Sequence, residues 1–124
     1  MQTTLSSLSL RACVAAAALF LAQSAFAHAH PKQRAPSAGV TVGADQKQVS
    51  IEFDDALEPD FSSLQVADAN GKSVTVGKSS VDANDKKHMT VALDALKPGV
   101  YTVSWVAVAV DGHRTQGRYT FTVR

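Results

Sequence analysis

Cysteine is almost absent from this sequence: Cys13 is the only one among its 124 residues. A domain that follows Cys13 can form no disulfide, so its apolar core alone must hold it together. It also lacks a thiol nucleophile and the ligands for cysteine-based copper(I), zinc and iron–sulfur centres, which are therefore excluded. Cys13 itself lies at the start of an apolar run rather than after it, so we interpret it as part of a leader and not as a lipid attachment site.

Long apolar runs and an excess of either charge are also missing. The apolar stretch from Ala12 to Ala22 is too short for a bilayer-spanning helix, which needs about 20 apolar residues. Apart from Arg11, basic and acidic residues occur in equal numbers. With no basic stripe and no aromatic platform, the sequence predicts no nucleic-acid partner.

Residues 1–27 have the pattern of a secretory signal peptide. They contain the basic Arg11, no acidic residue, a short apolar run and then Ala25-Phe26-Ala27, which matches the small-x-small site of signal peptidase. We therefore expect export through the Sec pathway, cleavage after Ala27 and a periplasmic mature chain of residues 28–124. An uncleaved N-terminal anchor and cleavage a few residues away are the alternatives.

Residues 28–124 are enough for one small domain, and their hydrophobic pattern is typical of β-strands. Apolar and polar residues alternate in short runs that are separated by turn residues every roughly 8–12 positions. The acidic segment 54–61 is interrupted by Pro59 and is expected to be a loop with at most one helical turn. About seven short strands of this kind predict an all-β, immunoglobulin-like β-sandwich. The runs recognised are residues 49–53, 64–66, 74–76, 88–93, 100–110 and 119–123.

Two local features indicate how the strands are joined and packed. Asn70-Gly71 favours a tight hairpin turn between the runs on either side of it. Tyr101 and Trp105 are four residues apart in one run, so in a strand their side chains point to the same face. We expect that face to be the core.

Cleavage after Ala27 would make a histidine the first residue of the mature chain. His28 would then carry a free amine and an imidazole on one residue, and together they can chelate one metal ion. Near the other end of the chain, Asp111 and His113 flank Gly112. Residues two apart in an extended stretch point the same way, and the glycine lets the backbone bend. Because Asp-Gly is also a common hairpin signal, this motif by itself indicates a turn more than a ligand pair.

Taken together, these groups form a ligand set that suits Cu(II). One amine, two imidazoles and one carboxylate in a plane match the geometry that Cu(II) prefers, and Cu(II) stands highest in the divalent affinity series. His28 would supply its amine and a ring nitrogen, His113 a second ring nitrogen, and Asp111 a carboxylate oxygen or an outer-shell hydrogen bond. Sequence alone does not show that the two segments meet.

Five short motifs follow one another in residues 28–124. They are His28-Ala29-His30, Pro36-Ser37-Ala38-Gly39, Trp105, Asp111-Gly112-His113 and Gly117-x-Tyr119-x-Phe121-x-Val123. In this order they resemble the CopC family of periplasmic copper-binding proteins, over the whole of the expected mature domain. The resemblance implies a Greek-key β-sandwich or barrel in which His28, Asp111 and His113 bind one Cu(II) ion per domain, an arrangement called a histidine brace. It also implies a non-enzymatic protein of copper resistance or homeostasis, with an inner-membrane copper transporter of the CopD type as a partner; we expect a monomer.

The sequence departs from the family pattern in two places. Some members bind Cu(I) through a methionine-rich loop, but residues 82–89 offer only His88 and Met89, so we expect no Cu(I) site. Met89 is predicted to lie in the core and His88 on the surface. Family members often carry a glutamate where Asp55 stands, so Asp55 is a candidate for an axial or outer-shell contact with copper, and Glu58 is a weaker one.

His30 offers a rival way to bind copper. A free amine, two backbone amide nitrogens that have lost their protons and the imidazole of the third residue can enclose Cu(II) or Ni(II) in a square plane. This amide chelate would use His30 and leave the ring of His28, Asp111 and His113 idle. We expect the brace to prevail near neutral pH because the fold pre-organises it.

Two other functions are compatible with the sequence. The same brace occurs in copper monooxygenases that oxidise polysaccharides, but those need an extended substrate surface with exposed aromatic residues. A metal-free sandwich module for adhesion or scaffolding is the other alternative, and it predicts that His28 and His113 affect only stability.

Overall fold

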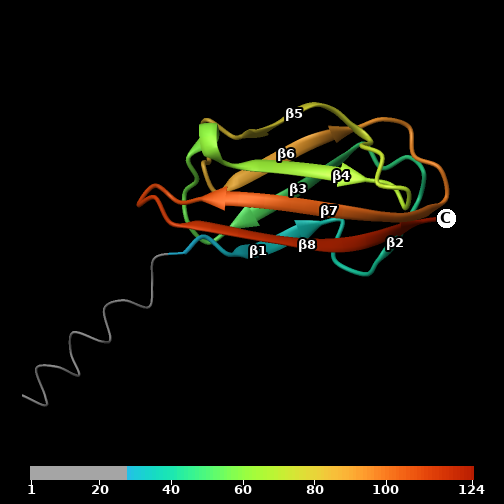
Figure 1. The fold of residues 1–124 in the computed structure, drawn as a ribbon, viewed down its shortest axis with the longest axis horizontal. Coiled ribbons are helices and arrows are strands. Elements are labelled where there is room, and N and C mark those ends of the chain that lie inside the picture. Colours follow the sequence, from blue (N-terminus) through green and yellow to red (C-terminus); the bar gives the residue numbers. More distant parts are fainter. Residues whose placement is uncertain (1–27) are drawn as a thin grey trace, which may run out of the picture.

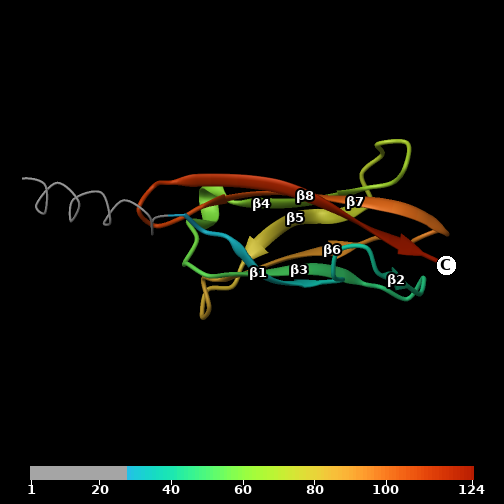
Figure 2. The same cartoon turned by 90° about the horizontal axis from the view of Figure 1, so that it is seen from below.

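Two four-stranded β-sheets lie face to face in residues 28–124, the part of the chain that the computed structural model describes. Figures 1 and 2 show the two layers from the front and from below. One sheet has the strand order β1-β3-β6-β5 and the other the order β2-β8-β7-β4. The expected leader, with its cleavage site after Ala27, lies outside these residues. The elements are β1 (Pro31–Ala35), β2 (Thr41–Val42), β3 (Gln48–Phe53), the 3₁₀ turn η2 (Pro59–Phe61), β4 (Ser63–Ala67), β5 (Thr75–Val81), β6 (His88–Leu93), β7 (Gly99–Val108) and β8 (Arg114–Val123).

The strand order confirms the predicted all-β sandwich. It matches an immunoglobulin sandwich of the constant type, with its Greek-key connections, in which the first strand is divided between the two sheets. β1 pairs antiparallel with β3, whereas β2 pairs parallel with β8. Because the first strand is divided into β1 and β2, the structure has eight strands, whereas about seven were predicted. No helix in the described residues is long and apolar enough to cross a membrane.

The core lies between the sheets and is built by strict alternation. Along β7 every second residue from Tyr101 to Ala107 is buried, and Phe121 and Val123 continue the pattern on β8. Each fully buried Val, Leu, Ile, Phe or Met side chain contributes roughly 1.5–3 kcal/mol relative to exposure. Without a disulfide, these apolar contacts must stabilise the domain. The largest side chains that are fully buried are Phe53, Phe121, Ile51, Leu57, Leu64 and Met89.

Trp105 and Tyr101 are both core residues, as predicted, and each makes a specific contact. Trp105 lies opposite Gly117 on β8, where an added Cβ would come within 2.6 Å of the indole, so the glycine makes room for the ring. The Tyr101 hydroxyl donates to the carbonyl oxygen of Lys97 at 2.6 Å and accepts the Lys97 N–H at 3.0 Å. This is the tyrosine corner of immunoglobulin-like sandwiches, and it fixes the entry into β7.

The hairpin prediction at Asn70-Gly71 was wrong in one respect. The tight turn is present, with Gly71 at φ 81° and the Asp68 carboxylate accepting the N–H groups of Asn70 and Lys72. The strands on either side, however, lie in different sheets and do not pair as a hairpin; an isolated bridge between Ala67 and Ser73 closes the turn. Asn-Gly reports the local backbone geometry, whereas the burial of both inner faces decides which strands pair.

The segment between β3 and β4 is a loop with one 3₁₀ turn, as predicted. It is attached to the end of β7 by two backbone hydrogen bonds. The N–H of Glu58 donates to the carbonyl oxygen of Val108 at 2.8 Å, and the N–H of Val110 donates to that of Ala56 at 3.2 Å. This attachment brings the loop that contains Asp55 beside the loop that contains Asp111.

Candidate metal centre

The candidate metal ligands lie at one end of the sandwich. In Figure 1 the beginning of the described chain, the β7–β8 connection and η2 all lie at this end, and the C-terminus lies at the other. The N-terminal segment of residues 28–30, the loop after β3 and the β7–β8 connection therefore meet here, although they are far apart in sequence.

Residues 28–30 are held in place by a buried alanine and three hydrogen bonds. Ala29 is fully buried, while His28 and His30 on either side of it are exposed. The Ala29 carbonyl oxygen accepts the Thr115 hydroxyl at 2.6 Å. The N–H of His30 donates to Oδ1 of Asp54 at 2.7 Å, and the N–H of Asp54 donates to the carbonyl oxygen of His30 at 3.0 Å. The segment thus joins the ladder between β1 and β3 and is part of the fold.

The β7–β8 connection is a tight turn that depends on Gly112. The N–H of Gly112 donates to the carbonyl oxygen of Ala109 at 2.8 Å, and the N–H of Ala109 donates to that of His113 at 3.0 Å. Gly112 has φ 90°, in the region that side chains other than hydrogen disfavour. The turn places Asp111 and His113 on the same side, as the sequence predicted.

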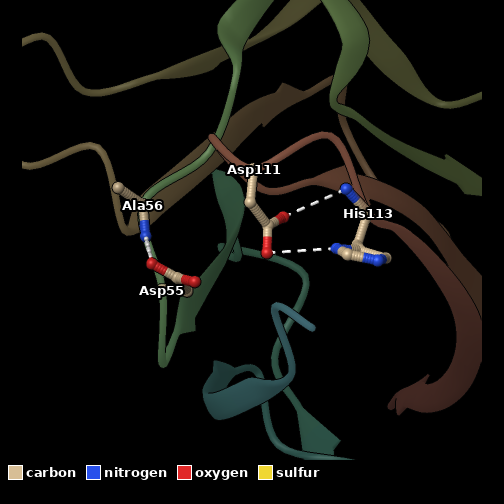
Figure 3. Close-up of polar contacts among 4 residues, drawn as sticks. All are labelled: Asp55, Ala56, Asp111 and His113. Atoms are coloured by element: carbon tan, nitrogen blue, oxygen red, sulfur yellow. Dashed lines mark hydrogen bonds and ion pairs between the residues drawn. The ribbon is translucent and has the colours of Figure 1, made fainter. Parts of the chain in front are cut away.

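Asp111 holds His113 with both of its carboxylate oxygens (Figure 3). Oδ1 accepts the backbone N–H of His113 at 3.1 Å, and Oδ2 lies 3.1 Å from the ring nitrogen Nδ1. These contacts, first the bond from the backbone N–H and then the bond from the ring, lower the pKa of Asp111. The carboxylate is therefore ionised at neutral pH and orients the ring so that Nε2 remains for a metal. Outer-shell carboxylates fix metal-binding histidines in this way in many proteins.

The structure brings His28 to His113. Their ring centroids are 5.0 Å apart and the ring planes are nearly perpendicular, at 87°. The His30 ring is further from that of His28, at 6.1 Å between centroids. His28, Asp111 and His113, the three residues predicted as ligands, therefore lie together in the structure.

Side chains alone do not complete a metal site here. Within residues 28–124 no three His, Cys, Asp or Glu side chains are placed so that they could hold a metal ion as they stand. Both oxygens of Asp111 already contact His113. In the full-length chain the nitrogen of His28 is bonded to Ala27 as an amide. Only removal of residues 1–27 would turn it into an amine and give the donor set its missing nitrogen.

The other candidate residues are placed less directly. The Asp55 carboxylate accepts the N–H of Ala56 at 2.8 Å, and Figure 3 shows it on the loop beside that of Asp111. His88 begins β6, where it is opposite Glu52 and partly exposed. Met89 is fully buried in the core, as predicted, so its thioether is not available to a metal ion.

Sequence reasoning missed the residues that position the N-terminal segment. Ala29, Asp54 and Thr115 carry no metal-binding signal of their own. The small apolar residue between two histidines was the available sign that the segment alternates between inside and outside. Sequence reasoning also did not single out Phe61, which is 69% exposed in η2. The other Phe, Tyr and Trp side chains of residues 28–124 are buried or half-buried, so none of them extends Phe61 into an exposed aromatic surface.

The fold and the site together define a class of protein: small immunoglobulin-like sandwiches that carry two histidines and a carboxylate at one end. The chain belongs to the CopC family: the CopC domain matches residues 32–124.

Several curated proteins are similar in sequence. Protein YobA of Escherichia coli strain K12 is 36% identical over 102 residues, which make up 82% of each chain. Copper resistance protein C of Escherichia coli is 31% identical over 111 residues, covering 84% of this chain and 87% of that protein. Copper transport protein CutJ of Bacillus subtilis is 32% identical over 85% of this chain, which corresponds to 20% of that longer protein.

Solved structures agree with this family assignment. CopC from Methylosinus trichosporium OB3b superposes with a TM-score of 0.72 at 33% identity, over 77% of this chain and 93% of that one. PcoC, a methionine-rich copper resistance protein from Escherichia coli, gives a TM-score of 0.70 at 31% identity, over 79% of this chain and 100% of that one.

Proposed function

We propose that this protein is a periplasmic Cu(II)-binding protein of copper resistance or homeostasis, and that it binds one copper ion per domain through His28, Asp111 and His113. One observation carries the proposal. The rings of His28 and His113 come from opposite ends of the domain sequence and lie 5.0 Å apart, in a chain of a family whose relatives are named for copper resistance and copper transport.

The mature N-terminus supplies the chemistry that side chains alone do not. Export through the Sec pathway and cleavage after Ala27 release the amine of His28, which chelates Cu(II) together with a ring nitrogen of the same residue. His113 adds Nε2, and Asp111 keeps that ring in place through Nδ1. Nitrogen donors in a tetragonal arrangement suit Cu(II) better than the other divalent first-row ions.

The exposed position of the site favours a carrier rather than an enzyme. The side chains of His113 and Asp111 are 53% and 38% exposed, so a bound ion would be within reach of a second protein. We propose an inner-membrane copper transporter of the CopD type as the recipient. A related domain occupies 20% of CutJ, a protein named for copper transport, which supports a functional link between the two activities. A monomer is sufficient for this role.

The decisive experiment compares two versions of the protein that differ by one N-terminal residue. One begins at His28, and the other retains Ala27 and so moves the amine away from the His28 ring. Competition titration and Cu(II) electron paramagnetic resonance are measured on both. We expect one tightly bound Cu(II) in the first and loss of tight binding in the second. Equal affinities would contradict the proposal.

A further inference from the structure

Residues 28–30 can present two different sets of ligands to copper, and a hydrogen bond in the structure favours one set over the other. The brace uses the amine and ring of His28 together with His113. The amide chelate uses the same amine, the backbone nitrogens of Ala29 and His30, and the ring of His30. We propose that Asp54 selects between them: by binding the N–H of His30 it keeps residues 28–30 extended and leaves copper to the brace. This inference rests on the proposed function.

The two modes need different backbone shapes. In the amide chelate, four nitrogens of three successive residues surround one ion in a plane, so the backbone must curl around the metal. Here the carbonyl oxygen of His30 accepts the N–H of Asp54 at 3.0 Å, and the next residue, Pro31, pairs with Phe53. The chain is therefore held as a continuation of the β1–β3 ladder and cannot curl while these contacts last.

Asp54 binds the backbone N–H of His30, whose nitrogen the amide chelate would need as a ligand. Its Oδ1 accepts the N–H of His30 at 2.7 Å. The nitrogen of His30 is one of the two amide nitrogens that the chelate would have to use. A hydrogen bond to an ionised carboxylate is roughly twice as strong as one between neutral groups. The bond therefore opposes the chelate directly, at one of its ligand atoms.

A second hydrogen bond, from Thr115 to Ala29, also favours the brace. The Thr115 hydroxyl donates to the Ala29 carbonyl at 2.6 Å, and Ala29 itself is fully buried. Thr115 is two residues after His113 on β8, so the same contact that fixes Ala29 places His28 beside His113. Curling the segment around an ion would break the bonds from Thr115 and Asp54 and pull Ala29 out of the core. Asp54 is thus a positioning residue that determines the binding mode without touching the metal.

The test uses mature protein that begins at His28 and compares the Asp54→Ala and Asp54→Asn variants. Alanine removes the acceptor for the His30 N–H, whereas asparagine retains a carbonyl oxygen at the same place. Cu(II) electron paramagnetic resonance and visible absorption distinguish the modes, since four nitrogens that include two deprotonated amides give a stronger ligand field and absorption at shorter wavelength. Thermal unfolding of each variant establishes that it is folded.

We expect the wild-type protein and Asp54→Asn to give the brace spectrum at neutral pH, and Asp54→Ala to shift bound copper toward the chelate spectrum. Adding His30→Ala to Asp54→Ala should remove the chelate signal and restore that of the brace. A folded Asp54→Ala protein with an unchanged brace spectrum would overturn the inference and leave the proposed function intact. A wild-type spectrum that does not respond to His113→Ala would overturn the proposed function, and the inference with it.

Discussion

The Thr115 hydroxyl donates a 2.6 Å hydrogen bond to the carbonyl oxygen of Ala29, 86 residues earlier in the chain. The bond joins the first residues of the domain to its last strand, at the end of the sandwich that carries the candidate ligands. Because Ala29 is fully buried, the N-terminal segment belongs to the packed structure. The position of His28 is therefore a property of the whole fold.

Replacing Thr115 with valine should weaken both the fold and the metal site. Valine preserves the volume of the side chain but leaves the Ala29 carbonyl without its donor. We expect the free energy of unfolding, measured by denaturant titration, to fall by about 1–2 kcal/mol. Cu(II) affinity should fall as well because His28 is no longer held beside His113. Thr115→Ser keeps the hydroxyl and serves as the control. Copper affinity that is equal in the valine and serine variants would show that this bond does not position His28.

Replacing His113 with alanine should remove a ring nitrogen from the copper ion. The loss of affinity should exceed the roughly 10–100-fold that is typical when only an outer-shell partner is removed. Competition titration and electron paramagnetic resonance measure the effect. His88→Ala is the matched control, because His88 lies in a strand opposite Glu52 and outside the candidate site. If His113→Ala behaves like His88→Ala while His30→Ala changes the spectrum, copper is held by the amide chelate.

Alanine substitutions at two glycines can separate a loss of stability caused by backbone strain from a loss of Cu(II) affinity caused by distortion of the site. Gly112 has φ 90° and Gly71 has φ 81°, and an added Cβ at either position would have no heavy atom within 4 Å. Substitution by alanine should therefore cost each variant a similar amount of stability, about 1–2 kcal/mol, through the backbone alone. Only Gly112→Ala should also lower Cu(II) affinity, because it distorts the turn between Asp111 and His113. Equal copper affinities in the two variants would contradict a role for that turn.

The pH dependence of copper binding should show how many protons are exchanged per copper ion, and this number differs between the two binding modes. Hydrogen bonds from His113 lower the pKa of Asp111, so this carboxylate is already ionised near pH 5 and takes up no proton when copper leaves. Any stability that it adds is present above the ordinary carboxyl pKa and is lost only as the pH falls through the lowered value. In the brace, copper competes with protons for one amine and two imidazole nitrogens, so we expect acidification to release the ion with an uptake of up to about three protons. The slope of the logarithm of apparent affinity against pH measures this number. The amide chelate would give about four.

The alternation of apolar and polar residues was sufficient to predict the sandwich, but not its first strand. β6 occupies residues 88–93, as predicted, and the core positions of Tyr101 and Trp105 follow from the same pattern. β1 was missed because Lys32 and Gln33 interrupt any alternation, and its burial is partial at two positions and absent at the others. Its strand conformation comes from pairing with β3, which is a long-range interaction that a local pattern does not contain.

The candidate site likewise contains some residues that the sequence could indicate and others that it could not. His28, Asp111 and His113 could be named as candidate ligands from the sequence because their residue types and order suggest metal binding, and the structure places them together. Asp54 and Thr115 could not be predicted as positioning residues, since an aspartate beside a loop and a threonine in a strand are ordinary. Their roles depend on hydrogen bonds to residues 24 and 86 positions away, which exist only after folding.

The fit of Trp105 over Gly117 gives the domain a built-in optical probe. Trp105 is the single tryptophan of the chain, and it is buried in a fixed environment. Gly117, directly opposite it on β8, is four residues after His113, which immediately precedes the strand, a distance of at most roughly 13 Å at the usual rise of a strand. If His113 binds Cu(II), as proposed, the paramagnetic ion would lie close enough to quench the indole emission. Fluorescence can therefore report occupancy of the metal centre with no label attached.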